Sequence, residues 1–375
     1  MSNNLKVSHL SSHHSPTSVR IFKKQCRSLS NAGFDVVYIV PGNGESVIDG
    51  VQFDYIKPSK GLLNRLFIKP LKIYLKARNN NSIVYHFHDP ELIFFGLLLK
   101  LRGKKVIYDI HEDLPAKIES INKPKIKKFL KLVSFVIGKF EKYAVNIFDM
   151  NVTVNEEIKL RFNSGNVEIV TNYPIVELFK EVRTQKDVVH NLNGKTFVYT
   201  GLLNEIRGIK QIIEALSLID EDEQVQLILL GSWENESYRN ECESLKGWKK
   251  TKYKGMLPLE EAYNEIINAD FTIINFLPLK NHLNSMPNKA FEYMAAGKPI
   301  IMSDFPYWKK LFKECAIFVN PEDPISISKG IETMIKYQSL RNNLGQNAKS
   351  MIEEKYSWEA ESKKLLKIYS RLVEN

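Results

Sequence analysis

Short apolar runs of strand character alternate with helix-like stretches along almost the whole chain, and this alternation constrains the fold more than any other feature. The strand-like runs of the first half are residues 5–10, 35–40, 51–56, 82–87, 105–109, 150–154 and 167–170. Those of the second half are residues 196–200, 225–230, 252–254, 271–276, 299–302 and 316–319. Strands of continuous apolar character are typical of parallel sheets that helices cover on both faces. The sequence therefore predicts an α/β fold of doubly wound parallel sheets.

Helices are expected between these runs, for example over residues 17–31, 91–102 and 209–219. Three more are expected near the end, at about 324–337, 340–355 and 358–373. A chain of 375 residues exceeds what one hydrophobic core usually serves, so two domains are expected. The alternation breaks at Thr171-Asn172-Tyr173-Pro174, and the polar stretch up to Lys195 has the character of a linker. We expect an N-terminal domain over residues 1–172 and a C-terminal domain over residues 173–357.

The cysteines and the apolar runs indicate a cytoplasmic protein. Cys26, Cys242 and Cys315 are odd in number and widely spaced, which favours reduced core thiols. The first ten residues form one short strand rather than a signal peptide. The longest apolar run, residues 92–99, is too short to span a bilayer.

The formal charge of +10 falls mainly in the first half, in two basic amphipathic segments. Residues 57–78 contain seven cations and no acid among many apolar side chains, and residues 122–148 place Lys123, Lys125, Lys127, Lys128 and Lys131 before a long apolar stretch. Such segments suit a peripheral contact with anionic lipid, where each cation contributes about 1 kcal/mol. The alternative is a helix buried on one face with a solvated basic rim. No zinc-finger, RNP or helix-turn-helix pattern supports a nucleic-acid partner.

Residues 284–303 have the pattern of a helix that begins at a phosphate. Pro287 suits the first helical turn, Asn284 or Ser285 can cap it, and Gly297 ends it. The unpaired N–H groups of the first turn and the helix dipole favour an anion such as a diphosphate, and Lys289 adds a full charge. Glu292 can accept both hydroxyls of a ribose. The alternative is a plain Lys289–Glu292 surface ion pair.

The string P-N-K-A-F-E-Y-M-A-A-G-K-P-I-I, residues 287–301, resembles the signature of the retaining glycosyltransferase family 4, the group 1 glycosyltransferases. The resemblance implies the GT-B fold, in which two Rossmann-like domains face a central cleft and the final helix, about 358–375, packs back on the N-terminal domain. It also implies a nucleotide-sugar donor held by the C-terminal domain and transfer with retention. Pro287, Asn288 and Asn284 are then expected donor contacts.

A second element, residues 199–209, resembles the other phosphate-binding turn of this family, with Gly201 at the turn and Arg207 aimed over it. Arg207 and Lys289 would hold the diphosphate, and their contacts would strengthen as charge grows on the departing nucleotide. Backbone groups at Gly231, Met256 and Leu257 are expected to approach the base.

The chain departs from the family pattern at two positions. Leu202 stands where an Arg is usual, and Asn284 stands where a Glu is usual, eight residues before Glu292. No Asp-x-Asp pair follows a strand, so neither a metal nor another cofactor is expected.

The strings His86-Phe87-His88-Asp89-Pro90-Glu91 and Tyr108-Asp109-Ile110-His111-Glu112 each follow a strand of the N-terminal domain. Polar side chains at such strand ends tend to be functional. The first string resembles a family element whose second histidine, here His88, approaches the donor sugar. Asp89 before Pro90 suits a helix cap. His111 and Glu112 are alternatives of lower weight, as interdomain hydrogen-bonding residues.

The loop Ser11-Ser12-His13-His14-Ser15-Pro16 replaces a Gly-rich loop that borders the acceptor in many relatives. Arg20-Ile21-Phe22-Lys23-Lys24 resembles the R-I-x-K pattern of bacterial surface-polysaccharide members. Adjacent histidines cannot easily bind one metal ion, so His13 and His14 are interpreted as polar loop residues.

These observations predict an enzyme, a glycosyltransferase that uses a UDP- or GDP-sugar and a saccharide or lipid-linked acceptor in cell-surface polysaccharide or lipopolysaccharide biosynthesis. The expected catalytic residues are His88, Glu292, Arg207 and Lys289. The expected location is the cytoplasm, peripheral on the inner face of the membrane. A nucleotide-sugar-binding or scaffold protein without catalysis, and a GT-B epimerase or phosphorylase, remain as alternatives.

Overall fold

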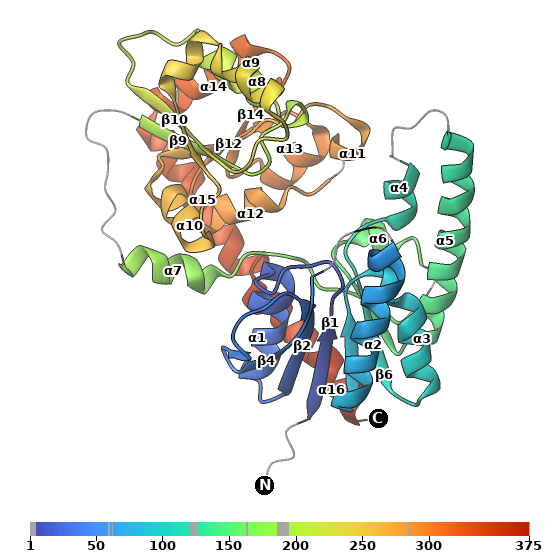
Figure 1. Ribbon diagram of the computed structural model, residues 1–375. Helices are drawn as coiled ribbons and strands as arrows, with labels where there is room; N and C mark the ends of the chain where they lie inside the picture. The colour runs from blue at the N-terminus through green and yellow to red at the C-terminus, as the bar shows by residue number, and fades with distance from the viewer. Residues whose placement is uncertain are drawn as a thin grey trace. The chain divides into compact units, whose positions relative to one another are not determined.

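The computed structural model describes residues 5–374 apart from 59, 60, 62, 120–125, 163, 186–194 and 284. The chain forms two compact units (Figure 1). The first unit contains Met1–Asn172 together with Trp358–Asn375, and the second contains Tyr173–Ser357. Each unit has its own sheet and its own helical layers.

The first unit is built on an eight-stranded sheet in the order β3-β4-β2-β1-β5-β6-β7-β8. Its strands are β1 (Lys6–Leu10), β2 (Asp35–Pro41), β3 (Val47–Ile48), β4 (Val51–Ile56), β5 (Val84–Phe87), β6 (Lys105–Ile110), β7 (Met150–Thr153) and β8 (Val167–Ile169). All neighbours are parallel except the β3–β4 pair. The order of strands reverses between β1 and β5, and such a switch point opens a crevice at the carboxyl ends of the strands.

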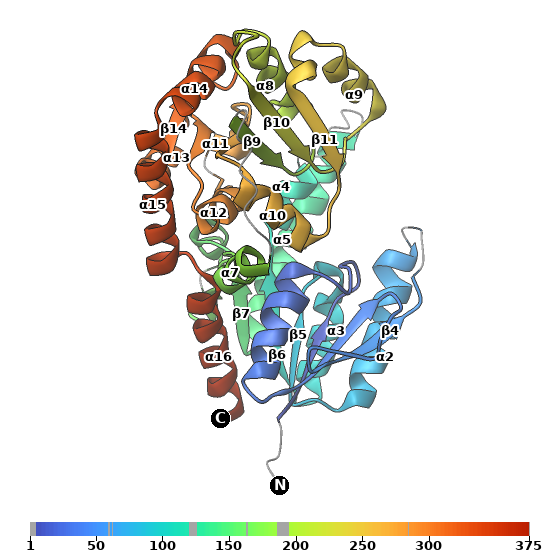
Figure 2. The ribbon, with the colours of Figure 1, turned by 90° about the vertical axis from the view of Figure 1, so that its left-hand side faces the viewer.

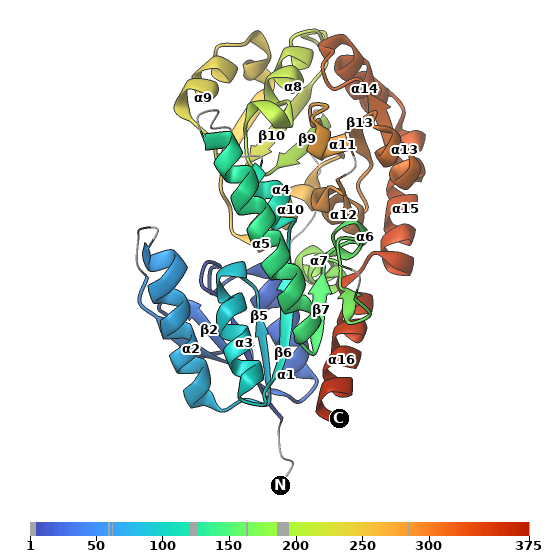
Figure 3. The same cartoon turned by 90° about the vertical axis from the view of Figure 1, so that its right-hand side faces the viewer.

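Helices cover both faces of this sheet. Figure 2 views the face of η1 (Val19–Cys26) and α1 (Arg27–Asn31), against which α16 (Trp358–Glu374) also packs. Figure 3 views the opposite face, with α2 (Lys69–Asn80), α3 (Ile93–Leu101) and α5 (Lys127–Ile147). The shorter segments are η2 (Asn64–Ile68), η3 (Pro90–Leu92), α4 (Leu114–Glu119) and α6 (Glu156–Lys159).

The second unit has a six-stranded sheet, all parallel, in the order β11-β10-β9-β12-β13-β14. The strands are β9 (Lys195–Thr200), β10 (Val225–Leu230), β11 (Thr251–Gly255), β12 (Phe271–Ile274), β13 (Ile300–Ser303) and β14 (Ala316–Val319). The switch point lies between β9 and β12, because the order counted along the chain is third, second, first, fourth, fifth, sixth.

One core of the second unit packs α8 (Ile209–Leu216), α9 (Glu236–Glu243) and α14 (Pro324–Lys336) on one side of the sheet. The other core packs α7 (Val176–Gln185), α10 (Leu259–Asn268), α12 (Asn288–Ala295), α13 (Pro306–Phe312) and α15 (Gln338–Lys355). The remaining segments are η5 (Glu205–Arg207), η6 (Lys246–Lys250) and α11 (Lys280–Leu283).

The predicted fold class, two doubly wound parallel-sheet units, is confirmed. One local prediction is wrong, and one short strand was missed. Residues 176–185 are not a linker but helix α7, because Phe179 and Val182 lie three residues apart and bury their side chains in a core. The short strand β3 was not predicted, since its two residues pair with β4 in a local antiparallel hairpin.

Candidate functional site

At the switch point of the second sheet, Lys289 lies directly over Gly201. A Cβ atom on Gly201 would come within 2.5 Å of the Lys289 Cε atom and 2.9 Å of its Nζ atom. Only glycine therefore fits at the end of β9, where the backbone also has a positive φ of 136°. The Nζ atom donates to the Thr200 hydroxyl at 3.5 Å. Burial lowers the pKa of Lys289, with Glu292 acting to raise it and Arg207 to lower it further.

Arg207 projects from the turn after β9. Its guanidinium stacks on the Phe276 ring with 3.8 Å between the Cζ atom and the ring centroid. The next residue, Gly208, is in the left-handed region, and a Cβ atom there would meet the Asn275 carbonyl oxygen at 2.2 Å. Asn275 is buried and donates to the Gly208 carbonyl at 3.4 Å, so it holds this turn. The predicted pair of cations, Arg207 and Lys289, is thus carried by two neighbouring segments of one unit.

Helix α12 begins one residue later than predicted, with Pro287 at the N-cap and Asn288 as its first residue. The prediction that Ser285 caps the helix is wrong, because the Ser285 hydroxyl donates to the carbonyl of His282 at 3.1 Å. Asn284, the other predicted cap and donor contact, lies outside the described residues. Pro287 is buried, and Asn288 is exposed at the helix entrance.

Glu292 is half-buried, and within the described part of the chain its carboxylate forms neither an ion pair with Lys289 nor a side-chain hydrogen bond. A surface ion pair therefore does not account for these two residues. Lys289 and Glu292 lie three residues apart on α12, so their side chains are on the same side of the helix.

The turns after β10 and β11 bring backbone groups close to Gly201 at the switch point. Gly231 donates its N–H to the Gly255 carbonyl at 2.8 Å, and a Cβ atom on Gly231 would lie 1.8 Å from the Gly201 oxygen. Met256 is exposed, and Leu257 is partly buried against a core of the unit. Leu202, which stands at the position of a usual Arg, is 43% exposed. A cavity of about 760 Å³ in this unit opens at the amino ends of β9, β12 and β13, and none of the predicted donor residues lines it.

The first unit has a cavity of about 540 Å³ at the carboxyl ends of β1, β5 and β6, next to the switch point. Its lining comes from the predicted strand-end strings and their neighbours: His13, His14, Arg65, His88, Asp89, Pro90, Glu91, Tyr108, Asp109, His111, Glu112, Leu114, Lys117 and Ile118. The structure thus brings together, in one unit, the histidines and carboxylates that the sequence places at strand ends.

Asp109 is the fully buried hub of this site. Arg20 donates to both carboxylate oxygens, Nη2 to Oδ1 at 2.6 Å and Nε to Oδ2 at 3.1 Å, and Gln25 donates to Oδ2 at 2.7 Å. These two donors are five residues apart on η1, whose i→i+5 bonding places them on one side of the helix. Burial alone would raise the pKa of Asp109, but the Arg20 guanidinium and the adjacent histidines His111 and His88 lower it well below its usual value.

His88, the predicted catalytic histidine, is wholly buried. Its Nδ1 atom lies 3.1 Å from Asp109 Oδ2, and its Nε2 atom lies 2.9 Å from His9 Nδ1. Burial lowers the pKa of His88 well below its usual value, so the ring is neutral at pH 7. A direct contact with a sugar would require one of the two hydrogen bonds to break. That contact stays a prediction.

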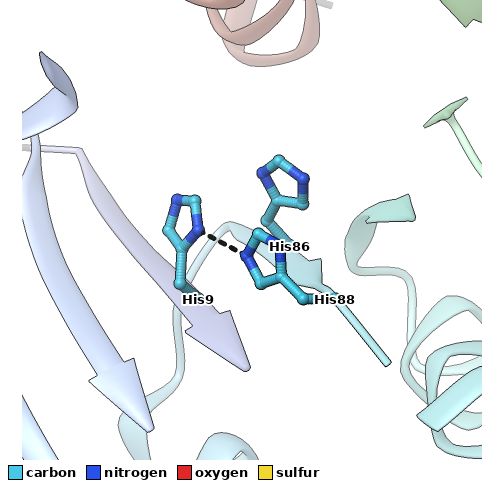
Figure 4. A group of neighbouring side chains, drawn as sticks. All are labelled: His9, His86 and His88. Atoms are coloured by element: carbon cyan, nitrogen blue, oxygen red, sulfur yellow. Dashed lines mark hydrogen bonds between the residues drawn. The ribbon is translucent and has the colours of Figure 1, made fainter. Parts of the chain in front are cut away.

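Three further members of this network were not predicted. His9 on β1 and His86 on β5 are register partners, so they share one face of the sheet, and His88 follows His86 on the same face (Figure 4). Tyr369 of α16 covers this face, with its hydroxyl 3.0 Å from His9 Nε2 and 2.9 Å from His86 Nδ1. The signal in the sequence was histidine inside strands that are otherwise apolar.

The three histidines also have metal-ligand spacing, as do His88, Asp109 and His111. The rings of His86 and His88 are stacked at 4.7 Å and 21°. Ring lone pairs lie in the ring planes, so those of two stacked rings do not converge on one ion. Asp109, in turn, already carries the Arg20 cation. Hydrogen bonding explains both groups better than metal binding does.

Asp89 does not cap a helix with its side chain, contrary to the prediction. It occupies the N-cap position of η3, but its carboxylate instead accepts from the Ser11 hydroxyl and the Ser12 N–H, both at 2.7 Å. The loop after β1 supplies these donors in place of the first turn of η3. This contact fixes the loop that carries His13 and His14 at the rim of the cavity.

The basic segments leave much apolar surface uncovered. Only four residues of α5 are buried, and its exposed apolar side chains are Phe129, Leu132, Phe135, Val136, Phe140, Tyr143 and Ile147. Exposed lysines flank them: Lys127, Lys128, Lys131, Lys139 and Lys142. Segment η2–α2 likewise exposes Leu66, Phe67, Ile68, Leu71 and Leu75. Lys123 and Lys125 lie outside the described residues. Within the described part of the chain, every helix is too short or too polar to cross a bilayer.

Comparison with known proteins identifies the second unit. Residues 182–351 match the family model of glycosyl transferases group 1, a segment that includes Arg207, Lys289 and Glu292. The curated relative MJ1069 of Methanocaldococcus jannaschii, an uncharacterized glycosyltransferase, is 24% identical over 299 residues, which cover 76% of this chain and 73% of that protein. The domain match and this relative make the protein a glycosyltransferase.

Two solved structures have the same fold along almost the whole chain. Sucrose-phosphate synthase from Thermosynechococcus elongatus has a TM-score of 0.75 at 17% identity, covering 98% of this chain and 99% of that one. HepE (Alr3699) from Anabaena, solved in complex with UDP, has a TM-score of 0.70 at 13% identity, covering 98% and 100%. At these identities the likeness shows the fold alone, which is the expected GT-B architecture.

Proposed function

We propose that this glycosyltransferase moves a sugar from a nucleoside-diphosphate donor, bound by the second unit, to a saccharide or lipid-linked saccharide acceptor. One observation carries the proposal. The Lys289 ammonium lies over Gly201 at the switch point, and no acidic side chain of the described residues forms an ion pair with it. A partly desolvated cation without a counter-ion is costly, and a bound diphosphate removes that cost.

The other groups assigned to the donor lie near the same switch point of the second sheet. Arg207 and Lys289 hold the diphosphate, and the open N-terminus of α12, entered through Pro287 and Asn288, adds N–H donors. Their attraction grows as negative charge develops on the leaving diphosphate, which lowers the barrier to transfer. These cations take the part that a metal ion plays where carboxylates hold one.

Glu292 binds the ribose, because its free carboxylate can accept both hydroxyls of a vicinal diol. Backbone groups at Gly231, Met256 and Leu257 approach the base, and Gly201 forms the turn at the diphosphate. UDP is the first nucleotide to test because the HepE neighbour was solved with UDP, and GDP is the second. Retention of configuration is proposed on the resemblance of residues 287–301 to glycosyltransferase family 4.

One feature favours a second candidate, a nucleotide-sugar-binding protein without catalysis. Leu202 puts an exposed apolar side chain at a position where an Arg is usual, so one cation is missing beside the diphosphate. Product release with an acceptor separates the two candidates, since both bind the nucleotide.

The acceptor is assigned to the first unit. The uncovered apolar face of α5, flanked by exposed lysines, suits the surface of an anionic bilayer. A membrane-bound lipid-linked acceptor would then be supplied at that surface. We propose a cytoplasmic enzyme, peripheral on the inner face of the membrane, that acts in cell-surface polysaccharide biosynthesis.

Calorimetric titration with UDP and GDP tests the donor assignment. The wild type binds one of them, and Lys289→Ala weakens that binding about 10- to 100-fold, because a charge-assisted hydrogen bond contributes about 1.5–3 kcal/mol. Lys349→Ala, an exposed lysine elsewhere on the second unit, is the matched control and leaves the affinity unchanged. Equal affinity of Lys289→Ala and wild type would refute the assignment.

A further inference from the structure

We propose that His111 is the residue that hydrogen-bonds a sugar hydroxyl in the cavity of the first unit. Asp109 is the carboxylate that orients it, and a buried chain of side chains from His86 through Tyr369 and His9 to His88 holds that carboxylate in place. The inference rests on the proposed function for the nature of the substrate. It reverses the expected roles of His88 and His111.

His88 and His111 differ in how much of each side chain is exposed to the cavity. Both side chains approach Asp109 Oδ2, His88 Nδ1 at 3.1 Å and His111 Nε2 at 3.0 Å. The His88 side chain has no exposed surface and has a partner at each nitrogen, whereas the His111 side chain is 19% exposed at the cavity. Of these two rings, only that of His111 can reach a ligand without losing an existing bond.

The donor and the acceptor of each hydrogen bond in this buried chain of side chains follow from counting protons. Asp109 is ionised and can only accept, so the proton between it and His88 belongs to His88 Nδ1. A neutral imidazole has one N–H, so His88 Nε2 accepts, and His9 Nδ1 carries the proton of the next bond at 2.9 Å. Burial keeps His9 and His88 neutral by lowering the pKa of each well below its usual value.

The same assignment of protons extends to the hydrogen bonds of Tyr369 on α16. His9 Nε2 now accepts from the Tyr369 hydroxyl at 3.0 Å, which leaves the Tyr369 oxygen to accept from His86 Nδ1 at 2.9 Å. His86 Nε2 ends the chain as a buried lone pair that has no hydrogen-bond partner among the described residues. All three histidines therefore carry their proton on Nδ1, and every bond of the chain points toward Asp109.

The proposal places the opposite tautomer at His111. Its Nε2 atom lies 3.0 Å from Asp109 Oδ2, and with the proton on Nε2 the Nδ1 atom keeps a lone pair that can accept a hydrogen bond. A histidine ordered by a carboxylate on one nitrogen is suited to receive a hydroxyl on the other. His14, whose ring centroid lies 5.2 Å from that of His111, limits where such a hydroxyl can sit.

The tautomers test the chain without any substrate. In the protein labelled with ¹⁵N-histidine, long-range ¹H–¹⁵N spectra at pH 8 should show His9, His86 and His88 protonated on Nδ1 and His111 protonated on Nε2. Tyr369→Phe should change the tautomer or the shifts of His9 and His86. Tyr85→Phe, which removes a buried hydroxyl bonded to the Ala77 carbonyl at 3.0 Å, should leave all four unchanged. An Nδ1–H tautomer at His111, or identical effects of the two variants, overturns the inference.

Turnover of the donor tests the role of His111. His111→Ala should lower kcat/KM about 10-fold or more, since one hydrogen bond to substrate and its orientation are lost, while the affinity for UDP or GDP stays that of the wild type. Tyr369→Phe should lower kcat/KM less, with the fold intact. A His111→Ala enzyme within twofold of wild type refutes the assignment. If wild type binds no nucleotide, the proposed function fails, and the tautomer pattern still decides the inference.

Discussion

Acid should destabilise the first unit well above the pH at which carboxylates titrate. His9, His86 and His88 are fully buried, and burial lowers the pKa of each well below 6.5. Below pH 6.5 the unfolded chain takes up a proton at each of these histidines and the folded unit does not. The unfolded state is therefore favoured as the pH falls, and the stability is fully present only above that value.

The magnitude follows from the difference in bound protons. Between pH 7.5 and 5.5 one such histidine removes about 1.4 kcal/mol from the free energy of unfolding, and the three together remove about 4 kcal/mol. Most small domains have only about 5–15 kcal/mol in all, so the effect is a large share of the total.

Urea unfolding at the two pH values measures this loss, read for the first unit alone by pulse proteolysis and mass spectrometry of peptides from β5 and β6. His86→Phe keeps an aromatic ring at the last position of the hydrogen-bonded chain of side chains. It should remove about one third of the pH dependence of the free energy of unfolding. His13→Asn, at an exposed histidine of the cavity rim, is the control and should leave the dependence intact. A loss below about 1 kcal/mol in wild type, or an unchanged slope in His86→Phe, would refute the reasoning.

Three other changes follow from the geometry. Glu292→Gln should raise the donor KM about 10-fold, since it weakens the acceptance of two ribose hydroxyls, and initial rates at varied donor concentration measure this. Gly231→Ala should lower the free energy of unfolding by about 1–3 kcal/mol in a thermal melt, because its Cβ atom would lie 1.8 Å from the Gly201 oxygen and its φ is 139°. Replacing Phe129 and Phe135 on α5 by Ser should reduce flotation with anionic liposomes, whereas Phe94→Ser, at an exposed phenylalanine of α3, should not.

The sequence predicts the layers of this protein well because buried parallel strands are continuous apolar runs. Strands such as β4, β10 and β14 begin and end at the predicted residues. Helix α7 was missed because its apolar residues are sparse within a polar stretch, and only packing against a core reveals them. The turns at Gly201, Gly208 and Gly231 could be located from the sequence, but the close contacts that require glycine there appear only in three dimensions.

The site of the first unit was predictable only in part. The strand-end position of His88 and His111 follows from the sequence, but their division of roles depends on which ring is buried. Tyr369 lies 283 residues after His86, and no local pattern connects them. The pairing of His9 with His86 depends on strand register, which the apolar pattern of two fully buried strands leaves open.

The two units manage charge in opposite ways, and each way suits the ligand proposed for that unit. In the second unit Lys289 forms no ion pair with the described residues, so an anionic ligand would relieve the cost of burying its charge. In the first unit Asp109 is matched by Arg20, Gln25 and His88 before any ligand arrives, and the chain behind His88 consists of neutral groups. A site that is already neutralised has little to gain from a charged ligand, but it holds its hydrogen-bonding groups in fixed directions. Such a site would suit the hydroxyls of a sugar, and the Lys289 cation would suit the diphosphate of the proposed donor.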